Sequence, residues 1–143
     1  MAQWTVEWLV AMEGNERTIP ALTFLQNQPI SVQRQLLAIL DAVRSTGPDQ
    51  WRDTTTHDPM SGICADLHEA RDRHDQTLYR LYLKWQRPAR RVIILTGASK
   101  PNDTALPDKF YEELAELAAT TTTSPPPFAT VDDVVRLTLK DRT

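Results

Sequence analysis

Alternating apolar and polar residues open the chain. Between Gln3 and Leu9, the apolar residues Trp4, Val6 and Trp8 occupy every second position, and polar residues occupy the positions between them. Successive side chains of a β-strand point to opposite faces. The pattern therefore predicts a half-buried strand with both tryptophans facing the core.

Helical periodicity follows this strand. A short helix is predicted after Asn15, its expected N-cap, and it should end before Pro29, because proline disfavours helical geometry in the residue that precedes it. Ser31 is the expected cap of a second helix. The apolar residues of that helix recur at i, i+3, i+4 and i+7: Leu36, Ile39, Leu40 and Val43. We expect the two helices to form a hairpin that packs across a sheet.

Three strand patterns come after a polar loop at 47–62. They span about residues 63–71, 77–86 and 91–98, and their short polar connections predict an antiparallel meander. The third is apolar on both faces, as a central strand is. An amphipathic helix is then expected at about 107–119. The predicted fold class is α+β, with an N-terminal strand, a helix hairpin, the meander in the same sheet and a C-terminal helix.

The last part of the chain differs in composition. We divide the sequence into a domain at 1–119 and an extension at 120–143, which begins with TTTTSPPP. That segment is expected to be extended, because prolines lack amide donors. Val131, Val134 and Val135 then predict a short helix that packs back on the domain or on a second copy of the chain, as a homodimer would. Two alternatives stay open for this extension: it shields a basic surface of the sheet, or it has no role.

Composition limits the class of protein and the cellular location that we expect. The chain has 143 residues, 41 % of them apolar, which suits a single globular domain. It has one cysteine, Cys64, so an internal disulfide and a cysteine zinc cage are excluded. No signal pattern or membrane-spanning apolar run is visible. We therefore expect a cytoplasmic protein without a membrane association and without a cofactor.

Charge is distributed unevenly. The formal net charge is −3, yet residues 66–100 contain eight Lys and Arg against four acids. In the middle strand of the meander, Tyr79, Leu81, Leu83 and Trp85 share the face expected to meet the helices. The other face contains Leu78, Arg80, Tyr82 and Lys84. Cations beside an aromatic ring suit single-stranded RNA, and a solvated sheet face is the other interpretation.

The first meander strand adds further candidates. Glu69 and Arg71 lie on one face, so an ion pair can fix the guanidinium group. His68 and His74 titrate near neutral pH and can transfer protons, although a structural role is the commoner one for a lone histidine. With His57 they lack the spacing of metal ligands, so no metal site is expected.

The order of elements, together with Leu67, Glu69, Arg71, Tyr79–Arg80 and the loop containing Lys100, resembles the RelE/ParE toxin superfamily and its HigB-like, phage-derived branch. The resemblance covers about residues 1–119. It implies a toxin of a type II toxin–antitoxin module that cleaves mRNA on the ribosome without a metal. It also implies a cognate helix-turn-helix antitoxin as the partner.

The resemblance implies a set of site residues. Phosphate binding and transition-state stabilisation fall to Arg71 and Arg80, a second cation or general acid to Lys100, and the base to His68 or Tyr82. The remaining cations of the sheet are expected to bind RNA: Arg73, Lys84 and Arg91. Because Arg80 is expected on an open face, Arg80→Ala should abolish activity and leave the fold intact.

A second function stays open. The chain is acidic, and only one lysine follows the last strand, whereas basic chains with two are usual in the family. These departures favour a non-catalytic binding protein of the same fold, either a ParE-like gyrase inhibitor or a degenerate toxin.

Overall fold

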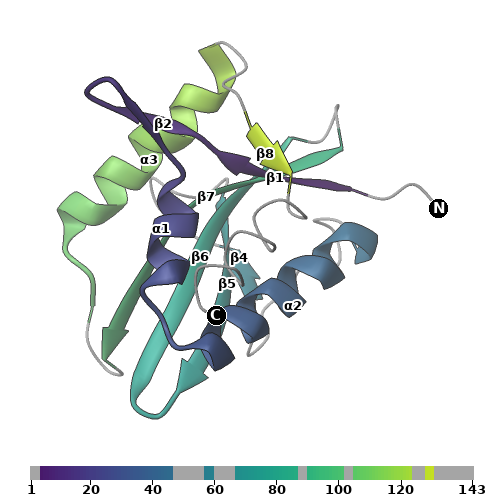
Figure 1. Ribbon diagram of the computed structural model, residues 1–143, viewed down its shortest axis with the longest axis vertical. Coiled ribbons are helices and arrows are strands. Elements are labelled where there is room, and N and C mark those ends of the chain that lie inside the picture. The colour runs from purple at the N-terminus through teal and green to yellow at the C-terminus, as the bar shows by residue number, and fades with distance from the viewer. Residues whose placement is uncertain are drawn as a thin grey trace.

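One mixed β-sheet organises the protein (Figure 1). The computed structural model describes residues 4–46, 57–59, 67–86, 90–101, 105–123 and 128–130. Within these ranges, six strands form a sheet in the order β4-β5-β6-β7-β1-β8, and β2 and β3 form a separate hairpin. The predicted fold class is confirmed: the sequence folds as an α+β chain with the expected order of major elements.

The meander forms the centre of the sheet. Strands β5 (Leu67–His74), β6 (Thr77–Gln86) and β7 (Arg91–Pro101) pair antiparallel, and β1 (Thr5–Leu9) lies parallel to β7. Strand β4 (His57–Pro59) pairs with the outer side of β5. Residues 92–95 of β7 are all buried between two layers of helices, which confirms the predicted central strand.

Helices α1 (Pro20–Gln26) and α2 (Ile30–Thr46) cover one face of the sheet. Their core includes the whole predicted stripe of α2, together with the tryptophan of β1 and alternate residues of β6: Leu36, Ile39, Leu40, Val43, Trp8, Leu81, Leu83 and Trp85. Helix α3 (Asp108–Thr123) covers the opposite face and buries a second cluster that includes Leu67, Tyr82, Ile93, Leu95 and Leu114.

The start of the helix hairpin differs from the prediction. Asn15 does not cap a helix, because β2 (Ala11–Glu13) and β3 (Glu16–Thr18) form a hairpin around it, with Gly14 at φ 63° in the turn. Helix α1 begins later, at Pro20, whose fixed φ and missing amide suit the first helical turn. Helix α2 begins at Ile30, so the expected cap Ser31 already lies inside its first turn.

The C-terminal part also differs. Helix α3 continues four residues past the predicted end at 119, to Thr123, because adding a residue to a formed helix is easier than nucleating one. The expectation of an extended TTTTSPPP segment is therefore wrong for residues 120–123, which are helical. Strand β8 (Phe128–Thr130), in the extension that follows this segment, pairs antiparallel with β1. The predicted helix at Val131–Val135 lies outside the described residues, as do residues 63–66 of the predicted first meander strand.

Candidate anion-binding site

Four cationic residues share one face of the sheet at the end where β5 turns into β6. The register places Arg71 opposite Arg80, and it places Leu78 between Arg73 and Lys100. Alternation along β5 puts these residues on the face of Leu67, which is the face that α3 covers. We call Arg71, Arg73, Arg80 and Lys100 the cation surface.

Helix α3 covers only part of this face. Figure 1 shows the turn between β5 and β6, and the end of β7, extending below all of α3. The burial of the cations agrees with this arrangement: Arg73 is exposed, and Arg71, Arg80 and Lys100 are half-buried. The cation surface therefore lies beside the start of α3 and is open to solvent at its outer side.

Glu69 lies at the base of the cation surface. Its side chain is only 8 % exposed, and its Oε2 forms an ion pair with Arg80 Nη1 at 3.2 Å. Its Oε1 lies 3.7 Å from Arg71 Nη1. The predicted pairing of Glu69 with Arg71 is confirmed, but Arg80, on the neighbouring strand, is the closer partner. One carboxylate thus holds two guanidinium groups on adjacent strands.

Arg80 is more enclosed than Arg71, with 13 % of its side chain exposed against 21 %. Burial opposes its charge, but Glu69 and the Tyr82 phenol together outweigh that effect, so the pKa of Arg80 is raised above its usual value. Its Nε is buried and has no hydrogen-bond partner within the described ranges. Arg80 is consequently a positive charge held in place by Glu69, and a guanidinium group is a suitable donor to an anion.

Tyr82 is placed differently from the prediction. It is fully buried, and its ring packs against Phe110 of α3 with centroids 5.3 Å apart. Burial raises the pKa of Tyr82, and the neighbouring Arg80 charge reverses that only in part. A buried phenol that stays neutral cannot stack on a nucleobase of RNA, and it cannot accept a proton as the general base in catalysis. Both expected roles of Tyr82 are therefore wrong, because α3 covers this part of the face.

His68 is on the other face of the sheet. Its Nδ1 accepts a hydrogen bond of 3.0 Å from Trp85 Nε1, and the two rings meet edge to face. His68 and Glu69 are consecutive in β5, so their side chains point in opposite directions. The expected role of His68 as a base at Arg80 is wrong, and its contact with Trp85 is structural.

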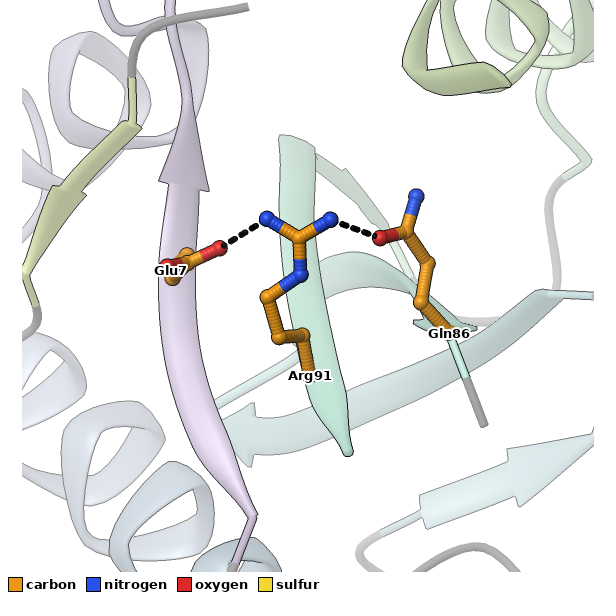
Figure 2. Close-up of polar contacts among 3 residues, drawn as sticks. All are labelled: Glu7, Gln86 and Arg91. Atoms are coloured by element: carbon orange, nitrogen blue, oxygen red, sulfur yellow. Dashed lines mark hydrogen bonds and ion pairs between the residues drawn. The ribbon is translucent and has the colours of Figure 1, made fainter. Parts of the chain in front are cut away.

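Lys84 and Arg91 are used in contacts within the fold. Lys84 Nζ donates to the carbonyl oxygen of Ala118 in α3 at 3.2 Å. Arg91 bridges three neighbouring strands, with Nη1 3.2 Å from Glu7 Oε2 and Nη2 2.6 Å from Gln86 Oε1 (Figure 2). Arg91 lies at the opposite end of β7 from Lys100. The structure therefore does not bring either residue to the cation surface.

Tyr111 was not singled out by the sequence, although it belongs to the surroundings of Arg80. It lies in the first half of α3, its ring meets Phe110 edge to face at 5.4 Å, and its phenol favours the charged form of Arg80. The periodicity of α3 marks Phe110 and Leu114 as inward-facing. Nothing in that periodicity indicates where the helix meets the sheet, so no sequence signal could have placed Tyr111 beside Arg80.

Other classes of site find no support in the part of the chain that the structure describes. No group of three His, Cys, Asp or Glu residues there could hold a metal ion. No helix in the same ranges is long and apolar enough to cross a membrane. Comparisons with family models, curated proteins and solved structures give no match for this chain.

Proposed function

We propose that this protein is the toxin of a type II toxin–antitoxin module and inhibits translation as a metal-free, ribosome-dependent mRNA endonuclease. The observation that carries the proposal is the pair of arginines, Arg71 and Arg80, placed side by side on adjacent strands around one buried carboxylate. The order of elements, with a three-stranded meander joined in parallel by the N-terminal strand, supports the resemblance to the RelE/ParE superfamily.

The proposed contribution of the chain to catalysis is electrostatic. In RNA cleavage by the neighbouring 2′-hydroxyl, negative charge develops on the phosphate oxygens as the new O–P bond forms and the 5′-oxygen leaves. A planar guanidinium group can donate to two such oxygens at once and stays protonated. Arg71 and Arg80 would stabilise this charge, and Lys100, on the same face, would neutralise the leaving oxygen.

A second candidate function is a non-catalytic binding protein of the same fold, such as a ParE-like gyrase inhibitor or a degenerate toxin. The burial of Tyr82 favours it, because α3 covers the aromatic ring on which an RNA base was expected to stack. The position of His68 on the opposite face has the same effect, since it removes the expected base from the site.

Expression without an antitoxin separates the two functions. The nuclease predicts growth arrest with cleavage of mRNA on translating ribosomes, and Arg80→Lys should reduce both because it keeps the charge but loses the fork. Arg34→Lys, on an exposed position of α2, is the matched control and should change neither. Gyrase inhibition predicts DNA damage and filamentation with intact mRNA. Unchanged growth at high expression refutes the nuclease and the gyrase inhibitor and leaves the degenerate toxin.

The proposed partner can be sought in the neighbouring gene. A toxin has to be held inactive in the cytoplasm, so we propose a cognate helix-turn-helix antitoxin encoded next to this chain. Co-expression of that neighbour should restore growth and co-purify with the chain. A gene with no small DNA-binding neighbour would count against the toxin–antitoxin assignment.

A further inference from the structure

His68 and Trp85 form a contact that exists in only one protonation state of the histidine. Trp85 Nε1 donates a hydrogen bond to His68 Nδ1 at 3.0 Å. An indole N–H can only donate, so Nδ1 has to present a lone pair to it. A protonated imidazole carries hydrogen on both nitrogens and has no such lone pair. His68 is therefore neutral in this structure, with its proton on Nε2.

The contact lies at a corner of the fold where four elements meet. His68 belongs to β5 and Trp85 to β6, and Trp85 is 9 % exposed. The Trp85 ring also meets the Trp4 ring edge to face, with centroids 5.0 Å apart. Trp4 leads into β1, and its backbone N–H donates to the carbonyl oxygen of Arg44 in α2 at 2.8 Å. A change at His68 can therefore reach β1 and α2 through Trp85 and Trp4.

Apolar residues are the direct cross-strand neighbours of His68. Pro59 of β4 and Leu83 of β6 lie opposite it in the register, and the buried stripe of α2 packs on the same face. The titratable residues of the described strands that share this face lie further along it: His57, Asp72, His74 and Tyr79. Helix α2 adds charged residues that are exposed or half-buried: Arg34, Asp41 and Arg44. Burial raises the pKa of Asp72, so that carboxyl favours folding in acid.

We propose that the hydrogen bond between His68 and Trp85 is a pH-sensitive switch, which is closed while His68 is neutral and opens when His68 is protonated. A proton on Nδ1 removes the acceptor and directs a second N–H at the donor of Trp85. The hydrogen bond is then lost, the Trp85 ring is held less tightly, and its contact with Trp4 changes. The switch does not rest on the proposed function, because it lies on the opposite face of the sheet from the cation surface.

The switch makes the stability of the fold depend on pH with a defined sign. The folded state keeps His68 neutral, whereas a histidine in the unfolded chain takes up a proton below about pH 6.5. The unfolded chain then binds more protons, so the contribution of the switch to stability is complete above about pH 6.5 and is lost as the pH falls. The equilibrium constant for unfolding should rise by up to about tenfold for each pH unit below that value, until His68 is also protonated in the folded protein.

Denaturant unfolding from about pH 8 to about pH 5 tests the switch with matched variants. His68→Asn keeps an acceptor oxygen near the position of Nδ1 but cannot titrate, so the rise in the unfolding constant should be absent. His74→Asn is the control, since His74 lies on the same face of the same strand with 47 % of its side chain exposed. His57→Asn removes the third histidine of the sequence. Both of these variants should keep the loss of stability in acid.

The indole N–H signal of Trp85 in NMR spectra reports the switch in the wild-type protein, without any substitution that could impair folding. As the pH falls, this signal should move toward that of an unbonded indole, with the same midpoint as the ring signals of His68. The indole signal of Trp8, whose buried Nε1 has no hydrogen-bond partner among the described residues, should stay in place. A Trp85 signal that is unchanged down to the pH of global unfolding, or a loss of stability that His68→Asn retains in full, would overturn the switch.

Discussion

The ion pair between Arg80 and Glu69 makes Arg80→Ala a test of stability as well as of activity. The sequence placed Arg80 on an open face, where its removal should leave the fold intact. In the structure it is 13 % exposed and pairs at 3.2 Å with a carboxylate that is 8 % exposed. Truncating Arg80 leaves Glu69 buried, with Arg71 still 3.7 Å from its carboxylate. The expected result is a folded but clearly destabilised protein.

The magnitude follows from the separation and the burial. At an effective dielectric constant of about 20, charges 3.2 Å apart attract by about 5 kcal/mol, of which desolvation cancels a large part. Breaking a buried pair from one side typically costs about 3–5 kcal/mol. Arg71 still offsets the charge of Glu69, so Arg80→Ala should lower the free energy of unfolding by about 2–3 kcal/mol.

Denaturant unfolding of four proteins measures this coupling: the wild type, Arg80→Ala, Glu69→Ala and the double variant. The double variant should be about 2 kcal/mol more stable than the sum of the single changes predicts, because it leaves no unpaired carboxylate. The midpoint should shift without a change in the denaturant slope. Arg34→Ala, on the exposed side of α2, should stay within about 0.5 kcal/mol of the wild type.

Two results would refute this reasoning. If Arg80→Ala changes the free energy of unfolding by less than about 0.5 kcal/mol, the guanidinium is solvated, as the sequence suggested. If the two single changes are simply additive, Glu69 and Arg80 do not depend on each other, and Glu69 cannot be what holds the Arg80 guanidinium in place.

Three further substitutions test other parts of the fold. Gly97→Ala should lower the free energy of unfolding by about 1–3 kcal/mol, because the added Cβ would lie only 2.6 Å from Cγ of the Phe24 ring. A variant as stable as the wild type would show that the ring moves aside. Tyr82→Phe should be neutral or stabilising at pH 7. Burial raises the pKa of Tyr82, so the folded state favours the neutral phenol. This contribution to the free energy of unfolding is complete below the unfolded pKa of about 10 and is lost as the pH rises above that value. Tyr82→Phe should therefore lose less stability than the wild type in alkali, and equal losses would contradict this. Arg91→Met should lower the free energy of unfolding by about 1 kcal/mol, because the contact with Glu7 is lost. The affinity for RNA oligonucleotides should not change. Weaker binding would indicate that Arg91 contacts RNA after all.

Side-chain parity predicted one face of the sheet well. Alternation in β1 and β6 placed Trp8, Leu81, Leu83 and Trp85 on a common face, and all of them belong to the core under α1 and α2. These assignments depend only on the period of a strand and on which face is the more apolar. Both properties are local, so a single sequence contains them.

The other face could not be predicted from the strands alone. Tyr82 and Lys84 alternate with Arg80 in the same strand, yet α3 covers the first two and leaves Arg80 near its edge. That boundary depends on the final position of α3, a helix that begins 24 residues after Lys84 in the sequence. Likewise, the pairing of Glu69 with Arg80 depends on the register of β5 against β6, which the turn at Asp75 (φ 54°) helps to fix. Periodicity predicts that such a helix exists but not which strand residues it covers.

The overall acidity of the chain is compatible with a local site for phosphate. The acidic residues of α3 contribute to the negative net charge, and all four are exposed: Asp108, Glu112, Glu113 and Glu116. At physiological ionic strength, exposed charges are largely screened beyond about 8 Å. Arg71 and Arg80, by contrast, lie around one buried carboxylate, and Arg73 and Lys100 lie on the same face of the sheet. Few phosphate contacts give weak, salt-sensitive affinity for free RNA. If the proposed function holds, the ribosome would have to present the RNA strand, so the proposal favours a ribosome-dependent nuclease over one that acts on free transcripts.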